Sequence, residues 1–123
     1  MITRFEEIAA WQKARVFNKS IYELTRRKEM TRDFGMVDQL RRASVSVMNN
    51  IAEGFERYRR AEFLQYLSMA KASAGEVRSM LYVAFDVGYI SKDEFASLLV
   101  QAQDVAGTME GFGHALSGAN QSH

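Results

Sequence analysis

The 123-residue sequence contains no cysteine and no proline. Without cysteine the chain can form no disulfide framework, thiolate nucleophile or cysteine metal site, and the cytoplasm is the default compartment. The sequence also has no run of about 18 uncharged apolar residues, so we expect no membrane-spanning segment. Its first residues lack the apolar stretch of a secretory signal. These absences predict a cytoplasmic protein that does not contact a membrane.

Histidine is scarce, because only His114 and the terminal His123 are present. A di-metal centre in a helical bundle needs Glu-x-x-His motifs on two helices, and the sequence contains none. The serines have no histidine and acid in the order of a hydrolytic triad. No glycine-rich loop precedes Lys-Ser or Lys-Thr, as a phosphate-cradling loop requires. The sequence therefore predicts no metal, no cofactor and no enzymatic activity.

Apolar residues make up 47% of the chain and charged residues 25%, which is ordinary for one globular domain of this length. The charges are unevenly distributed. Residues 1–60 carry 13 Lys or Arg and 8 Asp or Glu, whereas residues 61–123 carry 3 and 7. This asymmetry favours either a basic face for polyanions or attraction between the two halves, within the fold or between subunits.

Apolar residues recur at helical spacing in four segments, at about 6–28, from 33 to a weakening near Gly54, 61–87, and from 91 onward. Asp33 is a good N-cap for the second segment, and Gly88 is suited to the position after the third helix. Ser91 and Glu94 form a capping box before the fourth. The expected core stripes are Ala10, Ala14, Phe17, Ile21 and Leu24; Val37, Leu40, Ser44, Val47 and Ile51; Phe63, Leu67, Ala70, Ala74, Val77, Leu81 and Ala84; and Phe95, Leu98, Ala102, Val105, Met109, Phe112 and Leu116.

The seven-residue patterns favour helices that pack at shallow angles, as in a coiled coil. Short connections near 29–33, 57–60 and 88–91 make successive helices antiparallel. We therefore expect an all-α, antiparallel up-down-up-down four-helix bundle over residues 1–116. Residues 117–123 show no periodicity and are expected to form a flexible C-terminal tail.

Four stretches, in order along the chain, resemble one known family. They are RFEEIAAWQKA (residues 4–14), DQLRRASVSVMNNIAEGF (38–55), EFLQYLSMAKASAGEV (62–77) and DVGYIS (86–91). The chain is similar there to the four-helix-bundle proteins named after intervening sequences in bacterial 23S ribosomal RNA genes. The resemblance implies a homopentamer, a ring of five bundles around a central channel, and it does not imply an enzyme.

A more distant resemblance is to the accessory protein of diversity-generating retroelements. That relative is a basic pentamer associated with nucleic acid and a reverse transcriptase, so the resemblance implies RNA, DNA or such a protein as a partner. The chain departs from the first family at two positions. Met48 replaces a common proline, which implies a straighter second helix, and Arg59 replaces a serine that often caps the third.

An antiparallel hairpin that turns near Tyr58 places Ser44 near Ser73 and lets Arg41 or Arg42 pair with Glu76. Asn50 and Glu53 share one helical face beside the apolar stripe. We interpret these polar residues as a structural motif that sets helix register, binds backbone near the turn or joins a subunit interface. Nucleic-acid contact is the alternative. The motif comprises Arg41, Arg42, Asn50, Glu53, Ser73 and Glu76.

The turn after the second helix carries Arg57, Tyr58, Arg59 and Arg60. Three cations around a tyrosine can neutralise phosphates and stack a base, as expected of a surface that binds single strands. Nearby glutamates weaken the positive field, and a solvated charged turn is the alternative interpretation.

The sequence has more apolar helical positions than one bundle core needs, since methionines and tyrosines flank the core stripes. We therefore expect a homo-oligomer, a pentamer by resemblance, that acts as a non-enzymatic binding or scaffold module for nucleic acid. A structural or protein-interaction pentamer with no nucleic-acid role is the alternative. The flanking residues are Tyr22, Tyr66, Tyr82, Tyr89, Met36, Met48, Met69 and Met80.

Overall fold

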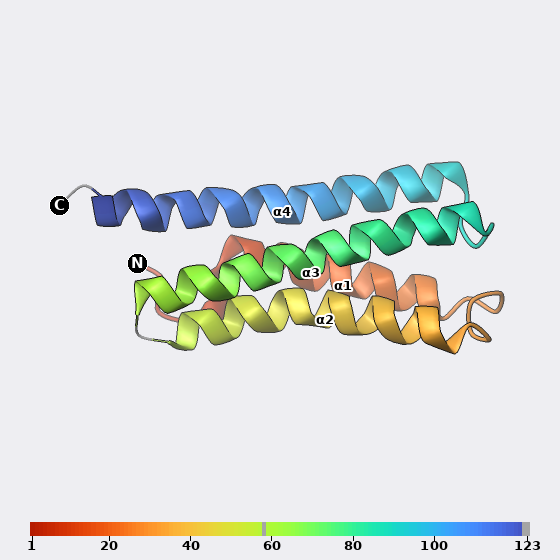
Figure 1. The fold of residues 1–123 in the computed structure, drawn as a ribbon, viewed down its shortest axis with the longest axis horizontal. Helices are drawn as coiled ribbons and strands as arrows, with labels where there is room; N and C mark the ends of the chain where they lie inside the picture. The colour runs from red at the N-terminus through yellow and green to blue at the C-terminus, as the bar shows by residue number, and fades with distance from the viewer. Residues whose placement is uncertain (58, 122–123) are drawn as a thin grey trace.

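The computed structural model describes residues 1–57 and 59–121, without the side chains of residues 119–121. Over these residues the chain forms a 3₁₀ helix, η1 (Phe5–Glu7), and four α-helices, α1 (Ala9–Thr25), α2 (Phe34–Glu56), α3 (Arg60–Asp86) and α4 (Lys92–Gln121). Successive α-helices run in opposite directions, and α1 and α3 each contact both α2 and α4 (Figure 1). The expected up-down-up-down four-helix bundle is confirmed. No helix of the described chain is long and apolar enough to cross a membrane.

The expected apolar stripes form the core. Those of α1 and α3 are buried throughout. On α2 the stripe is buried except for Val37, which is half-buried beside the buried Met36. On α4 the middle of the stripe is buried, whereas Phe95, Phe112 and Leu116 are half-buried and pack against the core. The helical period therefore places the core correctly along the length of the bundle.

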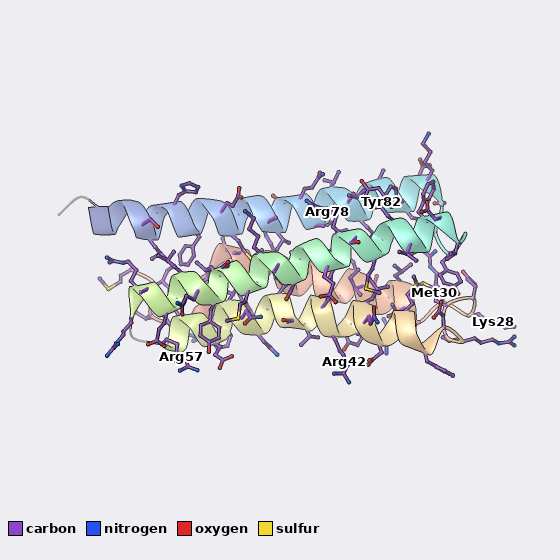
Figure 2. All side chains as sticks on the ribbon, in the orientation of Figure 1. Lys28, Met30, Arg42, Arg57, Arg78 and Tyr82 are labelled. Carbon is purple, nitrogen blue, oxygen red and sulfur yellow. The ribbon has the colours of Figure 1, made fainter. Side chains whose placement is uncertain are left out.

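Residues from the connections close the ends of the core, and the periodic pattern does not predict them. Ile8 lies between η1 and α1, Met30 in the turn before α2, and Ile90 in the turn before α4; each is at most 5% exposed. Met30 lies at the end of the bundle where these two turns meet (Figure 2). There the Tyr89 hydroxyl donates a 2.9 Å hydrogen bond to Asp33 Oδ2, which joins the two turns.

The expected caps are present. The Asp33 side chain accepts a 3.3 Å hydrogen bond from the Met36 backbone N–H at the start of α2. The Glu94 backbone N–H donates to Ser91 Oγ at 3.2 Å, and Glu94 Oε1 accepts from the Ser91 N–H at 2.9 Å, which completes the capping box. Gly88 has φ +84°, a left-handed conformation that favours glycine after a helix.

Gly54 does not weaken α2, contrary to the sequence prediction, since the helix continues to Glu56. Its role is to allow close packing. A Cβ at Gly54 would lie 2.7 Å from Tyr66 Cβ and 2.8 Å from Phe63 Cδ1 on α3. Only a residue without a side chain fits between these helices at this distance.

The bounds of α1 and α4 also differ from expectation. Ile8 is extended and separates η1 from α1, and α1 ends at Thr25, three residues before the expected end. α4 continues to Gln121, through residues assigned to the tail, and extends past the ends of the other helices in Figure 1. Backbone hydrogen bonds do not require an apolar stripe, and no proline interrupts them. α2 is one uninterrupted helix through Met48.

Candidate functional site

The connection from α2 to α3 carries Arg57 directly after the last turn of α2. Arg57 Nη2 donates to Tyr66 OH at 2.8 Å and to Glu53 Oε1 at 3.3 Å, and Nη1 lies 3.8 Å from Glu62 Oε2. The guanidinium also lies over the Tyr66 ring, 5.3 Å from its centroid. These contacts link the end of α2 to the start of α3 and hold the Arg57 side chain in place.

The neighbours of Arg57 favour its protonated, positively charged form. Its hydrogen bond with Glu53, and then the neighbouring Tyr66 hydroxyl, raise the pKa of Arg57 above its usual value. Glu53 and Glu62 offset part of the positive field that Arg57 projects. We therefore expect Arg57 to contribute less free charge at this turn than an arginine without acidic neighbours.

Arg57, Arg59 and Arg60 together line a groove of about 470 Å³ at this end of the bundle. Arg59 and Arg60 are exposed. The groove is also lined by Thr3 near the N-terminus, by Glu56 and Phe55 of α2, by Phe63 of α3 and by Leu116 of α4. We call this site the arginine groove. It combines three guanidinium groups with an apolar floor that comes from three different helices.

The floor of the arginine groove is held by aromatic packing. The Phe55 and Phe63 rings meet edge to face at 6.1 Å between centroids, and Phe63 meets Phe112 in the same way at 5.4 Å. Such a groove can bind an anionic group on its rim and an apolar or planar group on its floor. Tyr58, the expected stacking residue, lies outside the described residues. The sequence prediction did not assign Phe55, Phe63 and Leu116 to this site: Phe63 and Leu116 were assigned to the core stripes, and Leu116 is far from the turn in sequence.

Arg41 and Arg42 do not form the expected ion pair with Glu76. Arg41 Nε donates to Thr25 Oγ1 at 2.8 Å, and Arg42 Nε donates to Asp38 Oδ2 at 2.8 Å. Glu76 is exposed on α3, and it forms no hydrogen bond or ion pair with another described residue. The reason is that Arg41 lies on the side of α2 that packs against α1 and therefore points away from α3.

The remaining polar residues of the motif join α2 to its neighbours. Ser73 of α3 shares a 2.9 Å hydrogen bond with Ser46, two residues from the expected partner, Ser44. Ser44 instead donates to Asn18 of α1, a contact that the sequence prediction missed. Asn50 Nδ2 donates to the Ser46 carbonyl at 2.8 Å and to Ser46 Oγ at 2.9 Å. Ser46, Asn50 and Ser73 therefore form a small polar network along the α2–α3 contact.

The described side chains offer no group of three or more His, Asp or Glu that could hold a metal ion. Apart from Glu76, the polar residues of the motif form hydrogen bonds within and between helices. The chemistry of the arginine groove is that of a binding surface, with cations and an apolar floor.

Comparison with known proteins agrees with the fold. The profile described as 23S rRNA-intervening sequence protein matches residues 6–111. A crystal structure from Bacteroides thetaiotaomicron, described as a protein with unknown function from the S23 ribosomal protein family, superposes with a TM-score of 0.77 at 21% identity, covering 85% of this chain and 98% of that chain. That similarity shows the fold alone, and neither description names an enzymatic activity. Curated proteins give no significant match. Because the profile spans most of the sequence, this chain belongs to the 23S rRNA-intervening sequence protein family.

Proposed function

We propose that this protein is a cytoplasmic, non-enzymatic homo-oligomer that binds nucleic acid, with the arginine groove as its contact to the phosphate backbone. The observation that carries the proposal is the presence of Arg57, Arg59 and Arg60 around one groove with an apolar floor. Guanidinium groups pair with phosphates, and the half-buried Phe55 and Leu116 on the floor offer apolar surface to a sugar or an unstacked base. Single strands fit this surface better than duplex, because their bases can leave the stack.

Assembly of several copies is supported by apolar side chains that the bundle leaves exposed. These include Met69, Tyr82 and Val83 of α3, Val87 directly after α3, and Val100 of α4, which are 46% to 64% exposed. A contact between copies would remove this apolar surface from water, at about 25 cal/mol for each Å². The family resemblance implies five copies. Five arginine grooves on one particle would raise the effective concentration of each weak site for a long strand.

The resemblance to the retroelement accessory protein extends the proposal to a protein partner that handles nucleic acid, such as a reverse transcriptase. The competing function is a pentamer whose partner is another protein and that has no nucleic-acid role. The same exposed apolar residues of α3 and α4 favour that alternative, because a foreign protein could cover them as well as a second copy could.

Binding of labelled single-stranded RNA, single-stranded DNA and duplex at low salt tests the proposal. The variants are wild type, the triple variant Arg57→Gln/Arg59→Gln/Arg60→Gln, and a control with Arg78→Gln and Lys92→Gln, two exposed cations far from the groove. We expect wild type and the control to bind single strands and the triple variant to bind them more weakly. If wild type binds none of the three at low salt, the protein-interaction pentamer replaces this proposal.

A further inference from the structure

A second arginine is held rigidly at a different place, on the contact between α1 and α2. Arg41 is half-buried, its Nε donates to the buried Thr25 hydroxyl at 2.8 Å, and its guanidinium lies 4.6 Å from the centroid of the Tyr22 ring. Within the described chain, Nη1 and Nη2 of Arg41 form no hydrogen bond. An arginine whose plane is already fixed loses little conformational freedom when its free nitrogens bind an oxyanion.

Further cations follow the side of α1 that carries Tyr22, the ring under the Arg41 guanidinium. Arg15 and Lys19 of α1 and Arg26, the C-cap residue directly after it, are exposed. They lie on the same side of the helix as Tyr22, because they are seven, three and four residues from it. Arg15 stacks on Trp11 at 5.8 Å, and none of the three forms an ion pair with another described residue. We define the α1–α2 face by these residues together with the two arginines of α2: Arg15, Lys19, Tyr22, Arg26, Arg41 and Arg42.

Acidic groups offset only part of this charge. Asp38 is paired with Arg42, and Glu53, further along α2, is paired with Arg57. Glu23 of α1 lies toward α4, where it lines a hollow with Arg27. The charges of Arg15, Lys19, Arg26 and Arg41 therefore remain in excess on the α1–α2 face. Polyanions are the chemical class that this excess attracts.

The α1–α2 face also continues from the arginine groove. A surface hollow along α2 runs from Asp38 and Arg41 past Asn49 to Glu53, the partner of Arg57. Arg42 and Arg57 both project from this edge of the bundle in Figure 2, whereas Arg78 and Tyr82 of α3 lie near α4. At 1.5 Å per residue, Arg42 and Arg57 are separated by about 22 Å along α2, or about six nucleotides of a stacked strand.

We propose that the α1–α2 face is a second phosphate-binding surface, along which a single strand bound in the arginine groove continues, with Arg41 as its pre-oriented contact. This inference rests on the proposed function and adds the direction of the strand and its length. A strand of about 4 nucleotides fills the arginine groove without reaching Arg41, whereas one of about 16 nucleotides covers both surfaces.

The test measures binding of single-stranded RNA and DNA of these two lengths over a range of salt. The variant Arg15→Gln/Lys19→Gln removes two exposed charges from the α1–α2 face, and Arg41→Gln removes the fixed contact. The matched control Arg78→Gln/Lys92→Gln removes two exposed charges from elsewhere. For the longer strand, the slope of log affinity against log salt should fall by about 1.4 in the double variant and by about 0.7 in Arg41→Gln. The control and the shorter strand should show no change.

The outcomes separate the two proposals. If wild type binds and the α1–α2 variants match the control for both lengths, the α1–α2 face is not used and the arginine groove stands alone. If these variants weaken binding of the longer strand but the arginine-groove triple variant does not, the strand binds the α1–α2 face and not the arginine groove. If the slope falls as much in the control Arg78→Gln/Lys92→Gln as in the α1–α2 variants, the effect comes from total charge and the inference is overturned. If wild type binds neither length, both proposals fail. Circular dichroism confirms that each variant is folded.

Discussion

Gly54 of α2 lies against Tyr66 of α3 so closely that an added Cβ would sit 2.7 Å from Tyr66 Cβ. The same tyrosine accepts a hydrogen bond from Arg57 and lies under its guanidinium. The close approach of the two helices therefore positions the first arginine of the groove. Packing of α2 on α3 and the geometry of the candidate site depend on the same pair.

The first prediction concerns Gly54→Ala. The new methyl group must push α2 and α3 apart, because both Tyr66 Cβ and the Phe63 ring stand in its way. We expect the free energy of unfolding, from urea titration, to fall by about 1–3 kcal/mol. Gly107→Ala on the open side of α4 is the control, since nothing lies within 4 Å of its Cβ position and helix propensity should raise stability by up to about 1 kcal/mol. A Gly54→Ala protein as stable as wild type would refute the role assigned to this glycine.

The second prediction concerns the closed end of the core. Met30 is fully buried although it lies in a turn, so Met30→Ala leaves a cavity and should cost about 2–5 kcal/mol in urea unfolding. Lys28→Ala in the same connection removes an exposed side chain and should change stability by less than about 0.5 kcal/mol. Similar small effects at both positions would mean that Met30 is not part of the core.

The third prediction concerns the start of α4. Ser91→Ala removes the hydroxyl that caps the Glu94 N–H and should lower the free energy of unfolding by about 1 kcal/mol. Ser97→Ala, at an exposed position inside α4, removes a hydroxyl without a capping role and should be neutral or slightly stabilising. If the two substitutions have equal effects, the capping box contributes nothing to stability.

The fourth prediction concerns alkaline pH. The hydrogen bond that Tyr89 donates to Asp33 raises the pKa of the Tyr89 phenol in the folded protein above its value of about 10 in the unfolded chain. Its contribution to stability is thus complete below pH 10 and is lost as pH rises through the folded-state pKa. Thermal melts above pH 10 should therefore show a smaller decline for Tyr89→Phe than for wild type. If thermal stability declines equally in both proteins, the hydrogen bond between Tyr89 and Asp33 makes no pH-dependent contribution to stability.

The fifth prediction concerns assembly. Val83→Glu/Val87→Glu places two carboxylates among the exposed apolar residues at the C-terminal end of α3 and should lower the molar mass measured by light scattering at micromolar concentration. Gln12→Glu, a substitution at an exposed position on α1, should leave the molar mass at the same multiple of the monomer mass as in wild type. A wild-type protein that is already monomeric would contradict the proposed oligomer.

Local patterns in the sequence predict the helices and most of the core. Leu40, Val47 and Ile51 could be assigned to the core because a 3.6-residue period turns them to one side whatever the neighbouring helices are. Ile8 and Met30 lie outside any helical period, and only the closure of the bundle ends buries them. The Gly88 turn and the capping box could be predicted because each depends on a few adjacent residues.

The candidate site is less predictable, because it depends on helix register and on residues far apart in sequence. The α2–α3 register differs by two residues from the expected one, since Ser46 rather than Ser44 meets Ser73. Ser44 and Ser46 lie about 200° apart around α2, so Ser46 faces α3 while Ser44 faces the core and α1. Leu116 reaches the arginine groove only because the bundle brings the end of α4 beside the α2–α3 turn.

The salt dependence of single-stranded RNA binding tests directly whether the arginine groove binds a phosphate backbone. We expect the affinity of wild type to fall as salt rises. The slope of log affinity against log salt should be smaller by about 2 in Arg57→Gln/Arg59→Gln/Arg60→Gln, since each lost phosphate contact removes about 0.7. Equal slopes for wild type and the triple variant would contradict phosphate binding by the arginine groove.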